Sequence, residues 1–423
     1  MSHLVKKSTY GDQPLRIAQV SKADSVGGGA STVADILFKE LPETGNIVFH
    51  YCLYSKSGFD FFRRPIGGHF NQRIIDENLA LKRQMGFAEI IPFEAPFFEK
   101  DLKDIGFDLF HFHDLSSAVS PMTLMKLARQ VPVVWTMHDC SPFTGGCLYP
   151  MGCERWLEQP ACTECPQHGT WPLDTVSDTA WINWEIRRIV HATQGLSLVS
   201  PSNWLAAQAE RSGLPRKKVS VIPNGIPEEP FLGLERSAVR ENLGIEKDAL
   251  VFCFTSGHLN DKRKNITDAI QALRAIDRGR VTVIVLGNIS SEVAAECAGF
   301  NLVAPGFIGD RKELAMYLTA SDAMIFTSLA ENHPLSVLEA MASGSAVIGY
   351  DTGGVPEQVR DGCEGLLVSN GDLSALKSLM KKLPDRPKIN SMGLAARERF
   401  RKQFTAKSMV EKYKAFFESQ ISF

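Results

Sequence analysis

The sequence lacks long apolar segments, and no uninterrupted run approaches the ~18–20 residues that a membrane-spanning helix needs. Met1 to Pro14 is polar and lacks the apolar core of a secretory signal. Positive charge is not in excess, because 46 Lys and Arg residues stand against 48 Asp and Glu residues. The absence of a basic field excludes general nucleic-acid binding. We expect a cytoplasmic protein, for which local basic patches leave open a peripheral contact at the inner face of the membrane.

Short-period repeats and low-complexity segments are also absent. At 423 residues the chain exceeds the about 250–300 residues that a single core usually reaches, so it should form two or three domains. Short apolar runs alternate with amphipathic helical stretches along the chain. In the first half these runs span residues 15–20, 47–53, 108–112, 131–136, 196–199 and 219–222. After a break at Pro223-Asn224-Gly225 they recur at 250–255, 281–286, 302–303, 323–327 and 346–349, and residues 395–417 form a final charged helical pattern.

Strands that alternate with helices imply parallel sheets covered on both faces. We therefore predict an α/β protein with two Rossmann-like, doubly wound domains that face a cleft. The domains should span residues 1–222 and 223–395, with a C-terminal helix at 396–423. In such open sheets ligands bind beyond the carboxyl ends of the strands. The turns that follow the strands are therefore the candidate sites.

The first such turn is Gly27-Gly28-Gly29, between a strand and a helix. Gly28 and Gly29 would let backbone N–H groups approach a phosphate at the helix N-terminus. A tight connecting turn explains the glycines equally well. Thr32 replaces the third glycine of the dinucleotide-binding pattern, and no Gly-Lys-Ser/Thr of a Walker loop follows.

Histidines follow two strands of the first half. His138, at the end of the 131–136 run, could contact a sugar hydroxyl, although a lone His is more often structural. His111 and His113 should lie on one side of their strand, and we expect structural roles for that pair.

Two turns of the second half carry charge. Lys262-Arg263-Lys264-Asn265 would place cations beside a helix N-terminus, which suits a diphosphate, although a lone basic cluster is usually a solvated surface. The second turn, Glu331 to Glu339, contains Pro334, which suits the first turn of a helix. The N–H groups of Leu335 and Ser336 would then face an anion, with His333 in the same turn. Glu339 could take both ribose hydroxyls and Glu331 a hydroxyl of the sugar ring.

The string from Glu331 to Ala342 resembles the E-x7-E signature of the family 4 retaining glycosyltransferases, which have the GT-B fold. Residues 343–348 and 351–357 resemble the next strand and loop of that family, and 221–226 resembles its interdomain hinge. Lys264 stands where the family has a diphosphate-binding lysine. The resemblance covers nearly the whole chain, from the glycine turn to Glu357.

This resemblance implies a retaining transfer from a nucleoside-diphosphate sugar to a saccharide or lipid-linked acceptor, without a catalytic metal. His138, Lys264 and Glu331 would be catalytic. The first domain would bind the acceptor, the second would bind the donor, and the last helix would cross back to the first domain. A UDP-sugar epimerase of the same fold and a non-catalytic nucleotide-binding scaffold are the alternatives.

The chain departs from the family pattern at two places. His258 stands where the family usually has a diphosphate-binding Arg. Either Arg263 substitutes for that Arg, or phosphate binding is weaker at neutral pH. The common Phe-Gly pair after the first Glu is Asn332-His333, which we interpret as a variant of the motif.

Five of the nine cysteines lie between Cys140 and Cys165, within an insertion at residues 140–168. Four of them, Cys147, Cys153, Cys162 and Cys165, are candidates for a structural zinc, although only the last pair has the CxxC spacing. Buried thiols or a redox-labile disulfide are the alternatives. The insertion resembles one in polysaccharide-assembly members of the family, which implies a role in surface polysaccharide assembly.

Overall fold

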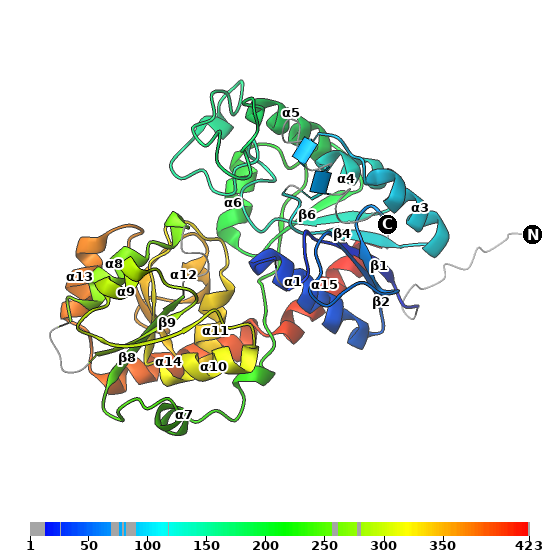
Figure 1. Ribbon diagram of the computed structural model, residues 1–423. Coiled ribbons are helices and arrows are strands. Elements are labelled where there is room, and N and C mark those ends of the chain that lie inside the picture. Colours follow the sequence, from blue (N-terminus) through cyan, green and yellow to red (C-terminus); the bar gives the residue numbers. More distant parts are fainter. Residues whose placement is uncertain are drawn as a thin grey trace, which may run out of the picture. The chain divides into compact units, whose positions relative to one another are not determined.

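The computed structural model describes residues 13–25, 27–68, 76–77, 80–81, 90–116, 118–255, 261–276 and 281–421 (Figure 1). The chain divides into two compact units. The first domain comprises residues 1–200, 208–222 and 410–423, and the second comprises 201–207 and 223–409. A single division at residue 222 is therefore not enough. Residues 201–207 belong to the second domain, and the last 14 residues belong to the first.

The first domain is built on a parallel sheet with the strand order β3-β2-β1-β4-β5-β6-β7. Its strands are β1 (Arg16–Val20), β2 (Ile47–Cys52), β3 (Arg63–Pro65), β4 (Leu109–Phe112), β5 (Val133–Thr136), β6 (Leu196–Ser200) and β7 (Ser220–Val221). The helices between them are α1 (Gly29–Glu40), α3 (Ala95–Ile105), α4 (Pro121–Leu127), α5 (Ala180–His191) and α6 (Asn203–Arg211), the last of which begins in the second domain. The strand order reverses at β1 and β4, which makes their carboxyl ends a ligand-binding position.

The second domain repeats this plan with the order β10-β9-β8-β11-β12-β13. The strands are β8 (Leu250–Thr255), β9 (Val281–Leu286), β10 (Asn301–Gly306), β11 (Ala323–Phe326), β12 (Ala346–Tyr350) and β13 (Gly365–Val368). The helices are α7 (Arg236–Asn242), α8 (Ile266–Leu273), α9 (Ser291–Glu296), α10 (Arg311–Ala320), α11 (Leu335–Ser343), α12 (Val355–Gln358), α13 (Leu373–Lys381) and α14 (Arg386–Gln403). Here the order reverses at β8 and β11.

The central strands are buried on both faces, which explains why they appear in the sequence as continuous apolar runs. All six residues of β9 and all five of β12 are buried. Side chains of β8, β11, α8, α13 and α14 complete the core of the second domain. The two sheets confirm the prediction of two Rossmann-like α/β domains.

The C-terminal helical pattern forms two helices, α14 and α15 (Ala406–Ile421), instead of the single helix that we expected at 395–417. The chain bends at Phe404 and Thr405, where Ile226 pairs with Thr405 in a parallel bridge. A Cβ atom on Gly225 would lie 2.3 Å from the Thr405 carbonyl oxygen, so the hinge requires glycine at this position. Tyr413 and Phe417 of α15 pack on the His111 ring in the first domain.

Candidate functional site

The carboxyl ends of β8 and β11 bring the charged turns of the second domain together. After β8, residues 256–260 lie outside the described residues, and His258 is among them. The chain continues as the short 3-10 helix η5 (Lys262–Lys264). Thr327, directly after β11, donates hydrogen bonds to the carbonyl oxygens of Lys264 and Asn265 at 3.3 and 2.9 Å. The switch point of the sheet is therefore lined by the residues that the sequence singled out.

Lys264 and Glu331 form an ion pair across this position, with 2.5 Å between Nζ and Oε1. Their side chains are 22% and 13% exposed. Both charges are thus mostly withdrawn from water, which strengthens their interaction with any charged group beside them. The lysine has three donor positions and can bind Glu331 and an anionic ligand together.

The N-terminus of α11 lies next to this pair in the chain and is open. Its N-cap residue, Pro334, has no side-chain capping hydrogen bond. Leu335 and Ser336 are partly exposed, and the first N–H groups of a helix have no partner within the helix. The backbone dipole and these donors favour an anion here.

Glu339 lies one turn inside α11. It is partly buried, and no hydrogen-bond donor among the described residues reaches its carboxylate. Burial raises the pKa of Glu339 to about 7, while the charge of Arg311 acts in the opposite direction. A ligand that donates hydrogen bonds to a buried carboxylate stabilises its charged form.

Two further predicted donor residues are engaged inside the domain. Arg263 forms an ion pair with Asp261, at 2.7 Å between Nη2 and Oδ2. The His333 ring lies 3.2 Å from Nε2 of Gln358 and packs on Phe404. A contact of either residue with the donor stays a prediction.

The loop after β12 supports Glu331 through its backbone. Gly353 has φ +57°, and a Cβ atom there would lie 1.8 Å from the Glu331 carbonyl oxygen. The Gly354 N–H donates to the Asn332 carbonyl oxygen at 2.9 Å. The glycine pair therefore lets two loops approach closely enough to fix the position of Glu331.

In the first domain, the glycine turn follows β1 at the corresponding switch point. Gly28 has φ +90° and precedes α1, which has no side-chain cap. Gly28 and Gly29 are exposed, and a Cβ atom on either would meet nothing within 4 Å. The turn is thus exposed, with open space beside the α-carbons of Gly28 and Gly29.

A line of hydrogen-bonded side chains joins β1, β4 and β5 at the same edge. Gln19 Nε2 lies 3.0 Å from Nε2 of His113, whose Nδ1 lies 2.9 Å from Nε2 of His138. Burial lowers the pKa of His138 to about 4, so its imidazole is neutral at pH 7. His111 and His113 have ring centroids 4.1 Å apart, which agrees with their expected placement on one side of the strand.

Sequence reasoning missed Asp139 as a candidate. Burial and the neighbouring charge of Asp114 raise the pKa of Asp139 to about 7, and its Oδ1 accepts a hydrogen bond from the Ser141 N–H at 2.7 Å. The only sequence signal was its place after His138 at the end of β5. Only the fold shows that Asp114 lies close enough to raise the pKa of Asp139.

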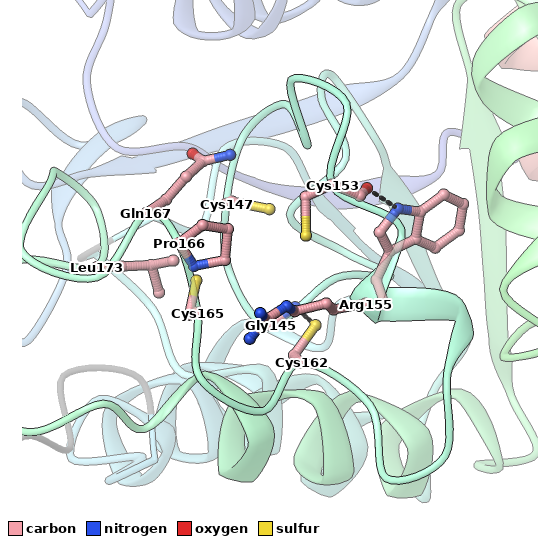
Figure 2. A pocket seen from close by; sticks show the side chains of 10 residues that line it. Gly145, Cys147, Cys153, Arg155, Cys162, Cys165, Pro166, Gln167 and Leu173 are labelled. Carbon is pink, nitrogen blue, oxygen red and sulfur yellow. Dashed lines mark hydrogen bonds between the residues drawn. The ribbon is translucent and has the colours of Figure 1, made fainter.

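Figure 2 shows Cys147, Cys153, Cys162 and Cys165 around one small cavity in the insertion. None of the cysteines forms a disulfide. Burial raises the pKa of Cys147 to about 11 and that of Cys162 to about 12. The insertion is anchored on α5, where Asn183 Nδ2 donates to the Gly145 carbonyl oxygen at 3.2 Å and Arg187 Nε donates to that of Ser141 at 2.5 Å.

No helix within the described part of the chain is both long enough and apolar enough to cross a membrane.

Two family models match the chain. One, described as "Glycosyltransferase Family 4", matches residues 27–229, and the other, described as "Glycosyl transferases group 1", matches residues 250–385. The chain is similar to the putative colanic acid biosynthesis glycosyl transferase WcaC of Escherichia coli K12, at 26% identity over 322 residues, which are 73% of this chain and 76% of WcaC. The matches to the other curated relatives compared span 66% of their own length or less.

Solved structures are similar over almost the whole chain. Sucrose-phosphate synthase from Thermosynechococcus elongatus has a TM-score of 0.69 at 18% identity, over 96% of this chain and 99% of that protein. HepE from Anabaena, solved in complex with UDP-glucose, has a TM-score of 0.64 at 16% identity, over 96% of this chain and 100% of HepE. These similarities confirm the GT-B fold.

Proposed function

This chain belongs to the family 4 glycosyltransferases, and we propose that it transfers a sugar from a nucleoside-diphosphate sugar to a saccharide or lipid-linked acceptor in surface polysaccharide assembly. Transfer would retain the anomeric configuration, as the resemblance implies. The similarity to WcaC, a putative colanic acid biosynthesis enzyme, supports the polysaccharide context.

The observation that carries this proposal is the Lys264–Glu331 ion pair at the carboxyl ends of β8 and β11, with the open N-terminus of α11 following in the chain. A cation and unpaired N–H groups suit a diphosphate, and a carboxylate suits the hydroxyls of a sugar. Glu339, one turn further along α11, would accept hydrogen bonds from the ribose. The UDP-glucose complex of HepE supports a UDP-sugar as the donor class.

The chemical step would break the bond between the anomeric carbon and the diphosphate oxygen. The acceptor oxygen would form its new bond on the same face of the sugar, and its proton would pass to the departing phosphate oxygen. Charge therefore develops on the diphosphate, where Lys264 and the N–H groups of Leu335 and Ser336 would stabilise it. Glu331 and His138 would orient the transferred sugar, and the Gly28-Gly29 turn would add N–H donors.

Exposed aromatic side chains between β2 and β3 support a peripheral contact with the membrane, which a lipid-linked acceptor would require. Phe59, Phe61 and Phe62 are 44%, 66% and 46% exposed. The Arg64 guanidinium lies over the Phe61 ring at 5.2 Å and also pairs with Asp101, at 3.1 Å between Nη1 and Oδ2. The wild type should sediment together with anionic lipid vesicles, and the F61S/F62S variant should stay in the supernatant.

A panel of nucleoside-diphosphate sugars tests the proposal. We expect one of them to raise the melting temperature of the wild type, since a ligand that binds the folded state stabilises it. The same donor should release its nucleoside diphosphate when an acceptor is added, and K264A should slow this release greatly. A donor that is converted to an isomeric nucleotide sugar without an acceptor would identify an epimerase. Binding without turnover would identify a scaffold.

A further inference from the structure

We infer that Cys147, Cys153, Cys162 and Cys165 bind one structural Zn²⁺ ion, which holds the loop that carries Trp171. The four thiols come from three separate turns of the insertion and line a single cavity (Figure 2). Zn²⁺ takes four thiolates in tetrahedral structural sites. The proposal does not depend on the donor or acceptor of the enzyme.

The backbone around the cysteines already donates hydrogen bonds to sulfur. The Gly145 N–H lies 3.2 Å from Sγ of Cys162. The Gln167 N–H lies beside the sulfur of Cys165, and the His168 N–H donates to the Cys165 carbonyl oxygen at 3.1 Å. Donors of this kind stabilise thiolates in metal sites and orient them. A cluster of ordinary buried thiols does not need them.

The turn from Cys162 to Cys165 brings these two cysteines close together. Cys162 and Glu164 both have positive φ, at 55° and 48°. Residues other than glycine rarely adopt this conformation, and doing so costs free energy. The strained turn places Cys162 and Cys165 on the same cavity, and a shared metal ion would compensate for its cost.

The charge of the filled site can be balanced locally. Binding of Zn²⁺ releases four protons from four thiols and leaves a net charge of −2 on the metal centre. Arg155 lines the cavity, and Arg187 lies close enough to interact with the charges of Cys147 and Cys162. In the described residues no group of three or more His, Cys, Asp or Glu side chains is placed so that it could hold a metal ion. The thiol side chains must therefore rotate toward the cavity that they line.

The loop after Cys165 leads directly to Trp171. Gln167 Nε2 donates to the Tyr149 carbonyl oxygen at 2.8 Å, and the Thr170 N–H donates to that of Gln167 at 3.1 Å. Trp171 is 45% exposed, and Nζ of Lys22, just after β1, lies 4.6 Å from the centre of its ring. The proposed zinc therefore fixes an exposed aromatic ring at the carboxyl end of β1.

Metal analysis of the full chain, purified with reductant and without chelator, tests the zinc site. We expect one zinc per chain in the wild type and in C363S, which removes an exposed thiol outside the insertion. C165S should lose the zinc, and C165H should keep it because imidazole is also a zinc ligand. A wild type that stays metal-free after growth in added ZnCl₂, or that contains a disulfide between these cysteines, overturns the proposal.

A second measurement needs no variant of the ligands. A mercurial reagent that titrates the thiols of the wild type should release the zinc, and the release is followed with a coloured zinc indicator. Release should make Trp171 more accessible to acrylamide, so fluorescence quenching should increase in the wild type and in W181F but much less in W171F. Trp181 is a matched control because it is 48% exposed and lies on α5. An equal increase in all three proteins would show that the loss of zinc does not change the exposure of Trp171.

Discussion

The two switch points of the molecule carry polar groups of different kinds. At the carboxyl ends of β8 and β11, Lys264 and Glu331 form a partly buried ion pair. At those of β1, β4 and β5, Gln19, His113 and His138 form a line of hydrogen bonds. Burial lowers the pKa of both histidines, so this line is uncharged at pH 7.

This difference matches the chemistry that each end would perform. A departing diphosphate gains negative charge, and fixed cations and N–H dipoles stabilise it best where water is limited. A saccharide is uncharged, and neutral donors and acceptors bind it without the cost of desolvating an ion. We therefore expect that changes to the charged residues of the second domain lower turnover. Changes to the neutral residues of the first domain should weaken the binding of a saccharide.

The largest expected effect is that of K264A. Removal of the cation should lower kcat by about 10²–10³-fold, the range found when one transition-state donor is removed. K264A should affect turnover more than fold stability, although the Glu331 carboxylate loses its cation. Release of nucleoside diphosphate measures turnover, and thermal unfolding measures stability.

K262A is the matched control for this change, since Lys262 is an exposed lysine of the same turn. It should keep nearly full turnover. If K264A unfolds below the assay temperature, or if K262A is equally inactive, the lysine has a structural or general electrostatic role.

Glu339 gives the next largest effect, on donor affinity. E339A should weaken donor binding by about 1.5–3 kcal/mol, because a charged hydrogen-bond partner of the ribose is lost. The pKa of Glu339 in the free protein is raised to about 7. Its carboxylate form accepts the ribose hydroxyls, so donor affinity should fall as the pH decreases through about 7. Calorimetric titration at pH 6, 7 and 8 measures this dependence.

E339Q sharpens the same test because its side chain does not titrate. Its donor affinity should be independent of pH over this range. A raised pKa means that the folded state keeps a proton that the unfolded state has already lost. The stability of the wild type therefore falls as the pH rises through about 7. E339Q should therefore melt at a higher temperature than the wild type at pH 8. An unchanged affinity in E339A would overturn the ribose assignment.

His138 should have a smaller effect of a different kind. H138A removes one neutral hydrogen bond, which corresponds to about tenfold or less in activity. Donor affinity should fall by no more than this, because the nucleotide contacts of the second domain remain. Because the pKa of His138 is lowered to about 4, H138A should also keep the pH dependence near 7 that E339Q removes. Kinetics at several pH values, run beside donor titration, separate the two residues, and loss of that dependence in H138A would contradict the assignment.

The sequence predicted most strands because buried parallel strands are continuous apolar runs, as in β8 and β9. It missed β3, which has three residues including two arginines, and β13, whose last three residues are only partly buried. Both are edge strands, where the apolar signal is weak. The charged turns were visible because their residues are close in sequence. The line from Gln19 to His113 spans 94 residues and depends on strand order, so no local pattern could reveal it.

Arg263 gives the smallest expected effect. The sequence proposed it as the substitute for a missing arginine in the diphosphate site, but the structure pairs its guanidinium with Asp261 in the same turn, at 31% exposure. A partly exposed ion pair of this kind contributes only about 0–1 kcal/mol. R263A should therefore weaken donor binding by less than about tenfold, well below the effect of E339A. D261A removes this ion pair. If Arg263 then turns to the diphosphate, donor affinity should rise in D261A and should return to the wild-type value in the D261A/R263A double variant. A loss in R263A as large as that of E339A would show that the arginine leaves Asp261 and binds the donor.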